Sequence, residues 1–291
     1  MKLIRYGERG RERPGLVDAQ GTVRDLSHFM ADLDGPALGR RSLERLRALE
    51  VDGLPRIETP VRYGPCVARP GKFICVGLNY RDHAAETGAP IPTEPVLFMK
   101  ATSAVSGPND PLIMPRNATK LDWEVELALV VGEECRYVDE ARAAASIAGY
   151  FVCNDVSERG FQLERGGQWD KGKGCDSFGP IGPWLVTADE VADPCNLRMW
   201  LSVNGRRFQD SSSNQMIFGP AYLLSYISQF MSLQPGDIVT TGTPPGVGLG
   251  LKPPAYLKVG DVVELGIEGL GTQRQTVVPW DPEAGQAASA G

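Results

Sequence analysis

The stretch Leu121-Asp122-Trp123-Glu124-Val125-Glu126-Leu127 decides the fold, and it continues into Ala128-Leu129-Val130-Val131. Acidic and apolar residues alternate at first and then give way to an apolar run, which predicts a strand whose second half is covered on both faces. Because strand side chains point the same way at every second residue, Asp122, Glu124 and Glu126 are expected on one face. Three like charges so close together need a compensating cation or contact with water. The stretch therefore predicts either a hard divalent metal site or a solvent-exposed acidic face.

The overall composition favours a soluble enzyme-sized chain acting on a small molecule. A length of 291 residues suits one large domain, or one with a small appendage. The net charge is -6, from 30 basic and 36 acidic residues, which gives no reason to expect nucleic acid or an anionic membrane surface as a partner. The chain shows neither a signal-peptide h-region nor an apolar run of membrane-spanning length, so we expect it in the cytoplasm. Its six cysteines form no C-x-x-C pair, which argues against a zinc ribbon or a dithiol redox motif.

Three regions are expected along the chain. Residues 1–68 form a small N-terminal unit with a strand at Leu3–Tyr6 and an amphipathic helix near Leu38–Leu49. Residues 69–282 form the main domain, in which apolar runs are separated by many glycines and prolines, as in β-rich folds. The tail, residues 283–291, is expected to be disordered.

His83 stands at the start of a predicted short helix that follows the apolar strand ending at Gly77. Glu86 lies three residues further on, so the two side chains share a helix face and the carboxylate can fix the imidazole tautomer. The competing interpretation is that His83 is an ordinary packed or surface residue. The pair is thus a candidate acid-base group.

Asp155 closes a second apolar strand, Gly149–Cys153, after Asn154. Residues at strand ends often carry chemistry on a rigid scaffold, and Asp155 could supply a third oxygen to an ion held by Glu124 and Glu126. An Asx turn or a helix N-cap would also explain an aspartate here.

Two glycine-containing loops are further candidates. The first, residues 165–174, nearly matches a phosphate-binding loop, but Gly174 replaces the metal-binding hydroxyl and no apolar strand precedes it. We therefore predict a lid that can bring Lys171 or Lys173 over a substrate, or else a merely solvated loop. The second loop, residues 242–248, follows a strand and contains Thr243, which suits an anion or oxyanion, or a structural turn.

Together these motifs make the chain resemble the fumarylacetoacetate hydrolase family. The resemblance covers roughly residues 72–280 and rests on motifs in a fixed order: Gly77-Leu78-Asn79-Tyr80 with His83 and Glu86, the Glu124 and Glu126 pair, Asn154-Asp155-Val156-Ser157-Glu158-Arg159, Gly172-Lys173, and Thr241-Gly242-Thr243-Pro244. It implies an α+β, β-dominated fold: a mixed β-roll with a small N-terminal α+β domain. It also implies a homodimer.

The resemblance further implies a metal ion and no organic cofactor. The ion would be Mg²⁺, Mn²⁺ or Ca²⁺ held by Glu124, Glu126 and Asp155, and open positions on such an oxygen-only site can keep water or take substrate. The resemblance assigns His83 and Glu86 to proton transfer and Lys173 to stabilising developing negative charge. It assigns the substrate-binding roles to four residues: Tyr80, Arg159, Gln162 and Thr243.

Within the family, the segment 165–176 looks most like enzymes that hydrolyse 2,4-diketo-3-deoxy-rhamnonate or fuconate. The expected reaction is cleavage of the C3–C4 bond of such an acylpyruvate to pyruvate and a hydroxy acid such as lactate. The alternatives are ureidoglycolate lysis, sugar-acid dehydration and oxaloacetate decarboxylation, which would use the same metal-stabilised enolate. A non-catalytic, metal-stabilised binding protein is the remaining alternative.

Overall fold

The structure, a computed structural model, describes residues 1–83 and 90–281. Glu86 and the predicted tail at residues 283–291 lie outside the described residues. Within the part of the chain that is described, no helix is long and apolar enough to cross a bilayer.

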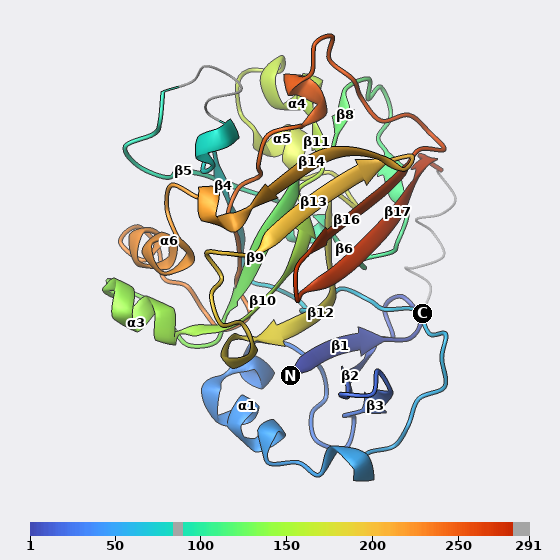
Figure 1. The fold of residues 1–291 in the computed structure, drawn as a ribbon, viewed down its shortest axis with the longest axis vertical. Helices are drawn as coiled ribbons and strands as arrows, with labels where there is room; N and C mark the ends of the chain where they lie inside the picture. The colour runs from blue at the N-terminus through green and yellow to red at the C-terminus, as the bar shows by residue number, and fades with distance from the viewer. Residues whose placement is uncertain (84–89, 282–291) are drawn as a thin grey trace.

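A large sheet of ten strands is the main structural element of the molecule (Figure 1). Its strands are mostly antiparallel, and β15 and β4 are a parallel pair next to the edge strand β5. Nine strands follow one another across the sheet: β3 (Val23–Asp25), β2 (Arg13–Val17), β1 (Lys2–Tyr6), β12 (Gly179–Thr187), β10 (Ile147–Asn154), β9 (Val125–Val131), β15 (Ile238–Thr240), β4 (Phe73–Gly77) and β5 (Val96–Met99). The tenth, β6 (Val105–Ser106), pairs with β12.

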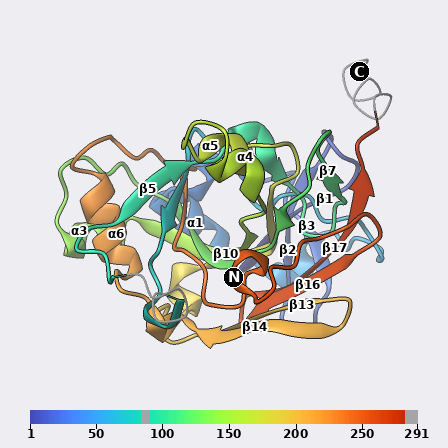
Figure 2. The same ribbon diagram turned by 90° about the horizontal axis from the view of Figure 1, so that it is seen from above.

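A second sheet of five strands packs against the first, and the two sheets together make the roll seen from above in Figure 2. Its strands are β14 (Arg206–Ser212), β13 (Arg198–Val203), β16 (Val262–Ile267), β17 (Gly271–Pro279) and β7 (Leu112–Met114). Leu127 and Leu129 of β9 share one core cluster with Leu201 and Leu265 of the second sheet. This cluster is the interior of the roll. The protein therefore has a β-dominated α+β fold with few helices, which confirms the predicted fold class.

The N-terminal strands extend the large sheet because β1 pairs with β12. Leu3 and Leu16 share a second core cluster with Ala128 and Val130, which lie on the other face of β9. β9 is therefore covered on both faces, as its apolar sequence predicts. The 1–68 unit and the main domain share a sheet and a core, and the boundary between them at residue 68 stays a prediction.

The helices are short and lie at the periphery. They are α1 (Arg40–Arg47), α3 (Glu140–Ala145), α4 (Arg159–Leu163), α5 (Asp170–Lys173) and α6 (Pro220–Ile227), and 3-10 turns occur at Gly35–Leu38, Val51–Gly53, Thr102–Ala104, Ala188–Glu190, Ser213–Gln215 and Gly248–Gly250. Asp139 caps α3 by accepting a hydrogen bond from the Arg142 N–H, and Pro220 begins α6. Helices α4 and α5 lie together at the top of the view in Figure 1, and they carry three of the predicted site residues, Arg159, Gln162 and Lys173.

The stretch 121–131 is not one continuous strand. It divides into β8 (Leu121–Asp122), which pairs with β11 (Ser157–Glu158), and β9, with a break at Trp123 and Glu124. The Asp122 carboxylate accepts hydrogen bonds from the Trp123 and Gly248 N–H groups, which draws this segment away from the large sheet. The prediction that Asp122 shares one strand face with Glu124 and Glu126 is therefore wrong.

Candidate active site

Three carboxylates meet where β9 begins and β10 ends. One oxygen from each of Glu124, Glu126 and Asp155 lies within 4.8 Å of the others. All three side chains are buried, with exposed fractions of 7%, 1% and 0%. The alternative of a solvent-exposed acidic face is therefore wrong for these residues.

The pairing of β9 with β10 brings the three carboxylates together. Cys153 is opposite Glu126 in this antiparallel pair, so the chain leaves β10 for Asp155 close to Glu124. The Asp155 N–H donates to the Glu124 carbonyl at 2.9 Å, and the Glu124 N–H donates to the Asn154 side-chain oxygen at 3.1 Å. These bonds fix both backbones, which is how a cluster of buried acids is held in place against its own repulsion.

Two buried lysines and one buried arginine surround the cluster. Lys173 Nζ donates to Glu124 Oε2 at 2.8 Å and to Asp155 Oδ2 at 2.7 Å. Lys100 Nζ donates to Asp155 Oδ1 at 2.5 Å. Arg159 Nη2 donates to Glu124 Oε1 at 2.5 Å, while its Nε donates to Asp122 Oδ2 at 2.8 Å.

The cations are unevenly shared, which separates the two glutamates electrostatically. Burial alone would raise the pKa of Glu124, but Lys173 and Arg159 outweigh it and hold that pKa at about 2. Burial and repulsion from Asp155 and Glu124 raise the pKa of Glu126 well above its usual range. The side of the cluster occupied by Glu126 is thus the part in greatest need of positive charge.

The residues present fit a hard divalent cation. Their donor set is three carboxylates, the type of oxygen ligand preferred by Mg²⁺, Mn²⁺ and Ca²⁺. If all four acids of the region, Asp122 included, are ionised, they outnumber Lys100, Lys173 and Arg159 by one charge. An added cation would relieve the crowding that raises the pKa of Glu126.

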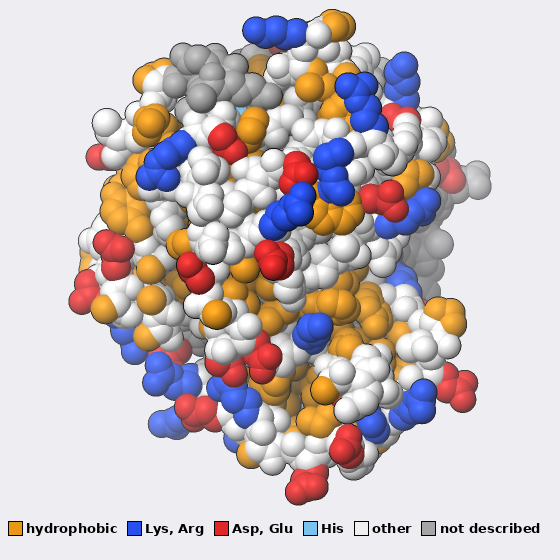
Figure 3. Space-filling view, in the orientation of Figure 1, with side chains coloured by type: hydrophobic (Ala, Val, Ile, Leu, Met, Phe, Trp, Pro, Cys, Tyr) orange, Lys and Arg blue, Asp and Glu red, His pale blue; other side chains and the backbone are white. Residues whose placement is uncertain are grey.

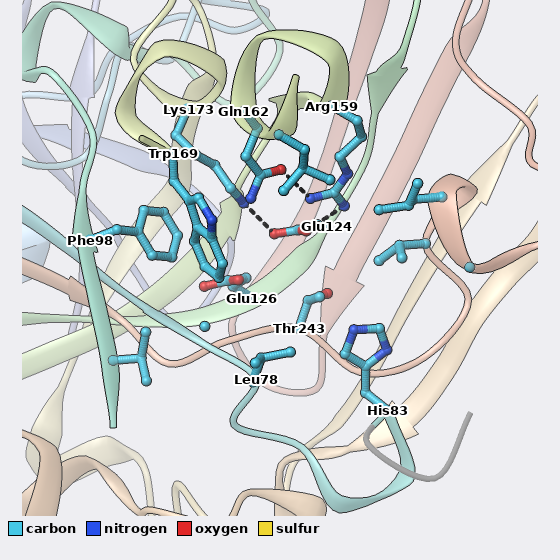
Figure 4. A pocket seen from close by; sticks show the side chains of 16 residues that line it. Leu78, His83, Phe98, Glu124, Glu126, Arg159, Gln162, Trp169, Lys173 and Thr243 are labelled. Carbon is cyan, nitrogen blue, oxygen red and sulfur yellow. Dashed lines mark hydrogen bonds and ion pairs between the residues drawn. The ribbon is translucent and has the colours of Figure 1, made fainter. Parts of the chain in front are cut away.

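A cavity of about 330 Å³ opens directly above the carboxylates (Figure 4). Glu124 and Glu126 lie at its floor, Arg159, Gln162 and Lys173 line one region of its wall, and Thr243 lines the region nearer His83. His83 approaches from the opposite side, beyond Leu78 and Thr243 in Figure 4. The rest of the wall is mainly apolar, with Val76, Leu78, Phe98, Leu163, Trp169 and Leu249.

The structure brings most predicted site residues to this cavity. Besides Glu124 and Glu126, the predicted site residues that line the cavity are His83, Arg159, Gln162, Lys173 and Thr243. Glu86, the predicted partner of His83, lies outside the described residues. Of the two lysines proposed for the loop, Lys173 is the one that is buried and lines the cavity. The exposed Lys171 instead donates to the Arg165 carbonyl.

Tyr80 and Thr243 are held differently from the prediction. Tyr80 is fully buried outside the cavity wall and its hydroxyl donates to Met199 Sδ at 3.1 Å, so we withdraw its assignment to substrate contact. The Thr243 hydroxyl donates to the Val125 carbonyl at 2.9 Å and accepts from Gln209 Nε2 at 2.8 Å. Thr243 lines the cavity while its hydroxyl anchors the loop to β9.

The sequence alone did not reveal Lys100, Trp169 or Phe98 as site residues. Lys100 follows the apolar strand β5, and the hydrogen bond from its buried ammonium to Asp155 makes it part of the cluster. Trp169 packs edge-on to Phe98 with ring centroids 5.4 Å apart, and Lys173 Nζ lies 4.9 Å from the Phe98 ring centroid. The sequence feature that could have predicted this part of the cavity wall is the aromatic residue Trp169 within the loop 165–174.

The chain belongs to the fumarylacetoacetate hydrolase family, because residues 72–278 match the family model described as "Fumarylacetoacetate (FAA) hydrolase C-terminal". A Burkholderia multivorans protein named "Putative hydrolase" is 59% identical over 276 residues, covering 94% of this chain and 98% of its own.

Two solved structures extend the comparison. A probable 2-hydroxyhepta-2,4-diene-1,7-dioate isomerase from Mycobacterium abscessus is 32% identical, with a TM-score of 0.83 and coverage of 97% of this chain and 100% of its own. Maleylpyruvate hydrolase from Sphingobium sp. SYK-6, in complex with manganese(II) and pyruvate, is 30% identical, with a TM-score of 0.79 and the same coverage of both chains. The chain is thus an enzyme of a family that contains hydrolases and isomerases.

Proposed function

We propose that this chain is a metal-dependent hydrolase that cleaves the C3–C4 bond of a 2,4-diketo-3-deoxy sugar acid. The products would be pyruvate and a hydroxy acid such as lactate. The observation that carries the proposal is the buried cluster of Glu124, Glu126 and Asp155 at the floor of a cavity that also holds Lys173 and His83. The similar maleylpyruvate hydrolase, which was crystallised with manganese(II) and pyruvate, supports both the metal and the pyruvate-containing product.

The residues have distinct roles in this proposal. A divalent ion held by Glu124, Glu126 and Asp155 would supply a Lewis acid next to the 2-keto acid end of the substrate. His83 takes a proton from water, and the water oxygen forms a bond to C4. Lys173 lies at the junction of cluster and cavity and stabilises negative charge that develops on the substrate. Arg159 and Gln162 hold substrate oxygens from α4.

The bond changes balance without a further reactant. When the C3–C4 bond breaks, its electron pair stays with the pyruvate fragment, and C4 keeps the hydroxyl as a carboxylic acid. The proton taken by His83 returns to C3, so one water is consumed and the enzyme is regenerated. An apolar cavity wall limits the entry of further water.

A second candidate, isomerisation of an unsaturated 2-hydroxy acid, is favoured by the similarity to the Mycobacterium abscessus isomerase. It requires proton transfer between carbons and consumes no water. Ureidoglycolate lysis, sugar-acid dehydration and oxaloacetate decarboxylation remain alternatives for the same acid-base and metal groups.

The test is a substrate panel assayed with Mg²⁺ or Mn²⁺. The panel contains several 2,4-diketo acids, ureidoglycolate, oxaloacetate and an unsaturated 2-hydroxy acid, and pyruvate, glyoxylate, carbon dioxide and ultraviolet absorbance are followed. We expect pyruvate from a 2,4-diketo acid, and we expect Lys173→Met to lower kcat by about 10²-fold or more. Turnover of only the other compounds would refute the proposal.

A further inference from the structure

We propose that this site selects 2-keto acids whose far end is short and uncharged and rejects dicarboxylic substrates. This inference rests on the proposed function for the position of the 2-keto acid end. It adds a charge rule, namely that the far end of a ligand must carry no charge, and this rule applies to binding as well as to turnover. Two features of the cavity carry it: all its strong cations are already paired, and the wall away from the carboxylates is apolar.

The strong cations that line the described part of the cavity are Lys173 and Arg159. Lys173 Nζ lies between Glu124 and Asp155, at 2.8 and 2.7 Å. Arg159 donates to Asp122, Glu124 and Gln162, at 2.8, 2.5 and 3.0 Å. Each cation keeps a spare N–H for a substrate oxygen, but its charge is already balanced by buried acids, so a second carboxylate on a substrate would meet no uncompensated cation there.

The basic side chains on the described loop before α5 are engaged outside the cavity as well. On the loop before α5, the Arg165 guanidinium stacks on Phe161 at 4.6 Å, and Lys171 donates to the Arg165 carbonyl. His83 is the remaining basic residue in the wall, and the proposed function assigns it to proton transfer rather than to holding a carboxylate.

The apolar wall is built to meet a carbon chain. Leu78, Leu163 and Leu249 line the cavity and are exposed by 38%, 47% and 39%, so together they offer apolar surface that the carbon chain of a ligand can cover. Trp169 lines the cavity beside Phe98 (Figure 4), and a Cβ on Gly77 would stand only 2.8 Å from its indole ring. The indole therefore packs directly on the β4 backbone and bounds that side of the cavity.

The test uses two unreactive acids with the same number of carbon atoms. Binding of 2-oxopentanoate and of 2-oxoglutarate to the Mn²⁺-loaded protein is measured by calorimetry. We expect 2-oxopentanoate to bind at least about tenfold more tightly, because a charge-assisted contact is absent for the far carboxylate. Equal or tighter binding of 2-oxoglutarate would overturn the inference.

A matched pair of variants tests the cause. Leu163→Arg places a cation at the exposed apolar wall, and Leu163→Gln changes polarity there without adding charge. We expect only Leu163→Arg to shift the binding ratio toward 2-oxoglutarate, by about tenfold. An unchanged ratio in Leu163→Arg, with Mn²⁺ affinity and thermal unfolding like those of the parent protein, would contradict the inference.

These measurements do not require turnover. If the protein cleaved no 2,4-diketo acid but still preferred 2-oxopentanoate, the charge rule would stand and the proposed reaction would fail. If it cleaved 2,4-diketo acids but bound 2-oxoglutarate as tightly, the reaction would stand and the charge rule would fail.

Discussion

At the scale of single residues, Glu126 is the carboxylate most in need of a cation. Lys173 and Arg159 contact Glu124, and Lys100 and Lys173 contact Asp155, whereas the hydrogen bond to Glu126 Oε2 comes from the Gly242 N–H at 3.0 Å. A backbone N–H offsets only part of the cost of burying a charge. Glu126 should therefore contribute strongly to metal affinity.

We predict that Glu126→Gln weakens Mn²⁺ binding by about 100-fold or more, because an anionic ligand becomes neutral. Titration calorimetry measures this directly. Glu134→Gln, at an exposed position near the end of β9, is the matched control and should bind Mn²⁺ like the parent protein. Unaltered Mn²⁺ affinity in Glu126→Gln would remove this residue from the ligand set.

The role of His83 is tested by separating chemistry from metal binding. His83→Ala should lower kcat by about 10²–10⁴-fold, the usual contribution of a general base. Mn²⁺ affinity should stay within about twofold, because His83 lies across the cavity from the carboxylates. A large loss of Mn²⁺ binding would instead make His83 a ligand.

At the scale of elements, Asp122 joins three segments that surround the cavity. Its carboxylate accepts from Arg159 Nε in α4 and from the Gly248 and Leu249 N–H groups, at 2.8, 2.6 and 3.0 Å. The residue contributed to the predicted acidic face, but its position in β8 makes it a support for Arg159 and for the loop that carries Leu249. Losing its charge should loosen substrate contacts while leaving the metal ligands in place.

Asp122→Asn should therefore raise KM for a 2,4-diketo acid by about tenfold or more, since charge-assisted hydrogen bonds of this kind contribute about 1.5–3 kcal/mol. Mn²⁺ affinity should change much less. Steady-state kinetics and calorimetry check the two parts, with Asp52→Asn as control because its side chain is 93% exposed. A parental KM in Asp122→Asn would show that Arg159 is positioned without it.

Elements with local signals could be predicted from the sequence. Asn204 and Gly205 both adopt positive φ, at 51° and 78°, and join β13 to β14 as the Asn-Gly pair predicts. The break between β8 and β9 could not be predicted, because the groups that cause it, Arg159 and the Gly248 N–H, are distant in sequence. The burial of Lys100 could not be predicted for the same reason, because its partner Asp155 lies 55 positions away in the sequence.

At the scale of the whole molecule, the N-terminal unit and the main domain are joined by charge as well as by sheet pairing. Arg62 donates to Glu12 at 2.9 Å and to both oxygens of Asp110 at 2.8 and 2.7 Å. The sequence indicated a small N-terminal unit over residues 1–68, because its strand and amphipathic helix precede the β-rich main domain. The pairing of β1 with β12 spans more than 180 positions and leaves no local signature.

Arg62→Ala should lower the free energy of unfolding by about 1–3 kcal/mol, because the nearly buried Glu12 and Asp110 carboxylates lose their partly buried partner. Chemical denaturation measures this change. Arg11→Ala, at an exposed position, should leave the stability unchanged within about 0.5 kcal/mol. Equal effects of the two variants would argue against a specific contribution from this network.

Acidic and basic side chains are interspersed over the face drawn in Figure 3, in keeping with the expectation of a small-molecule partner rather than nucleic acid. The homodimer implied by the family resemblance stays a proposal. Light scattering should then give twice the chain mass of 31.5 kDa. A value of one chain mass would show that the cavity works within a monomer.

The measurement that tests the central claim most directly is an anomalous-scattering crystal structure of the protein soaked with Mn²⁺ and pyruvate. We predict one strong peak within about 2.0–2.6 Å of carboxylate oxygens from Glu124, Glu126 and Asp155, with pyruvate in the adjoining cavity. A manganese peak elsewhere, or a cluster still bridged by Lys173 with no metal among its oxygens, would contradict the account.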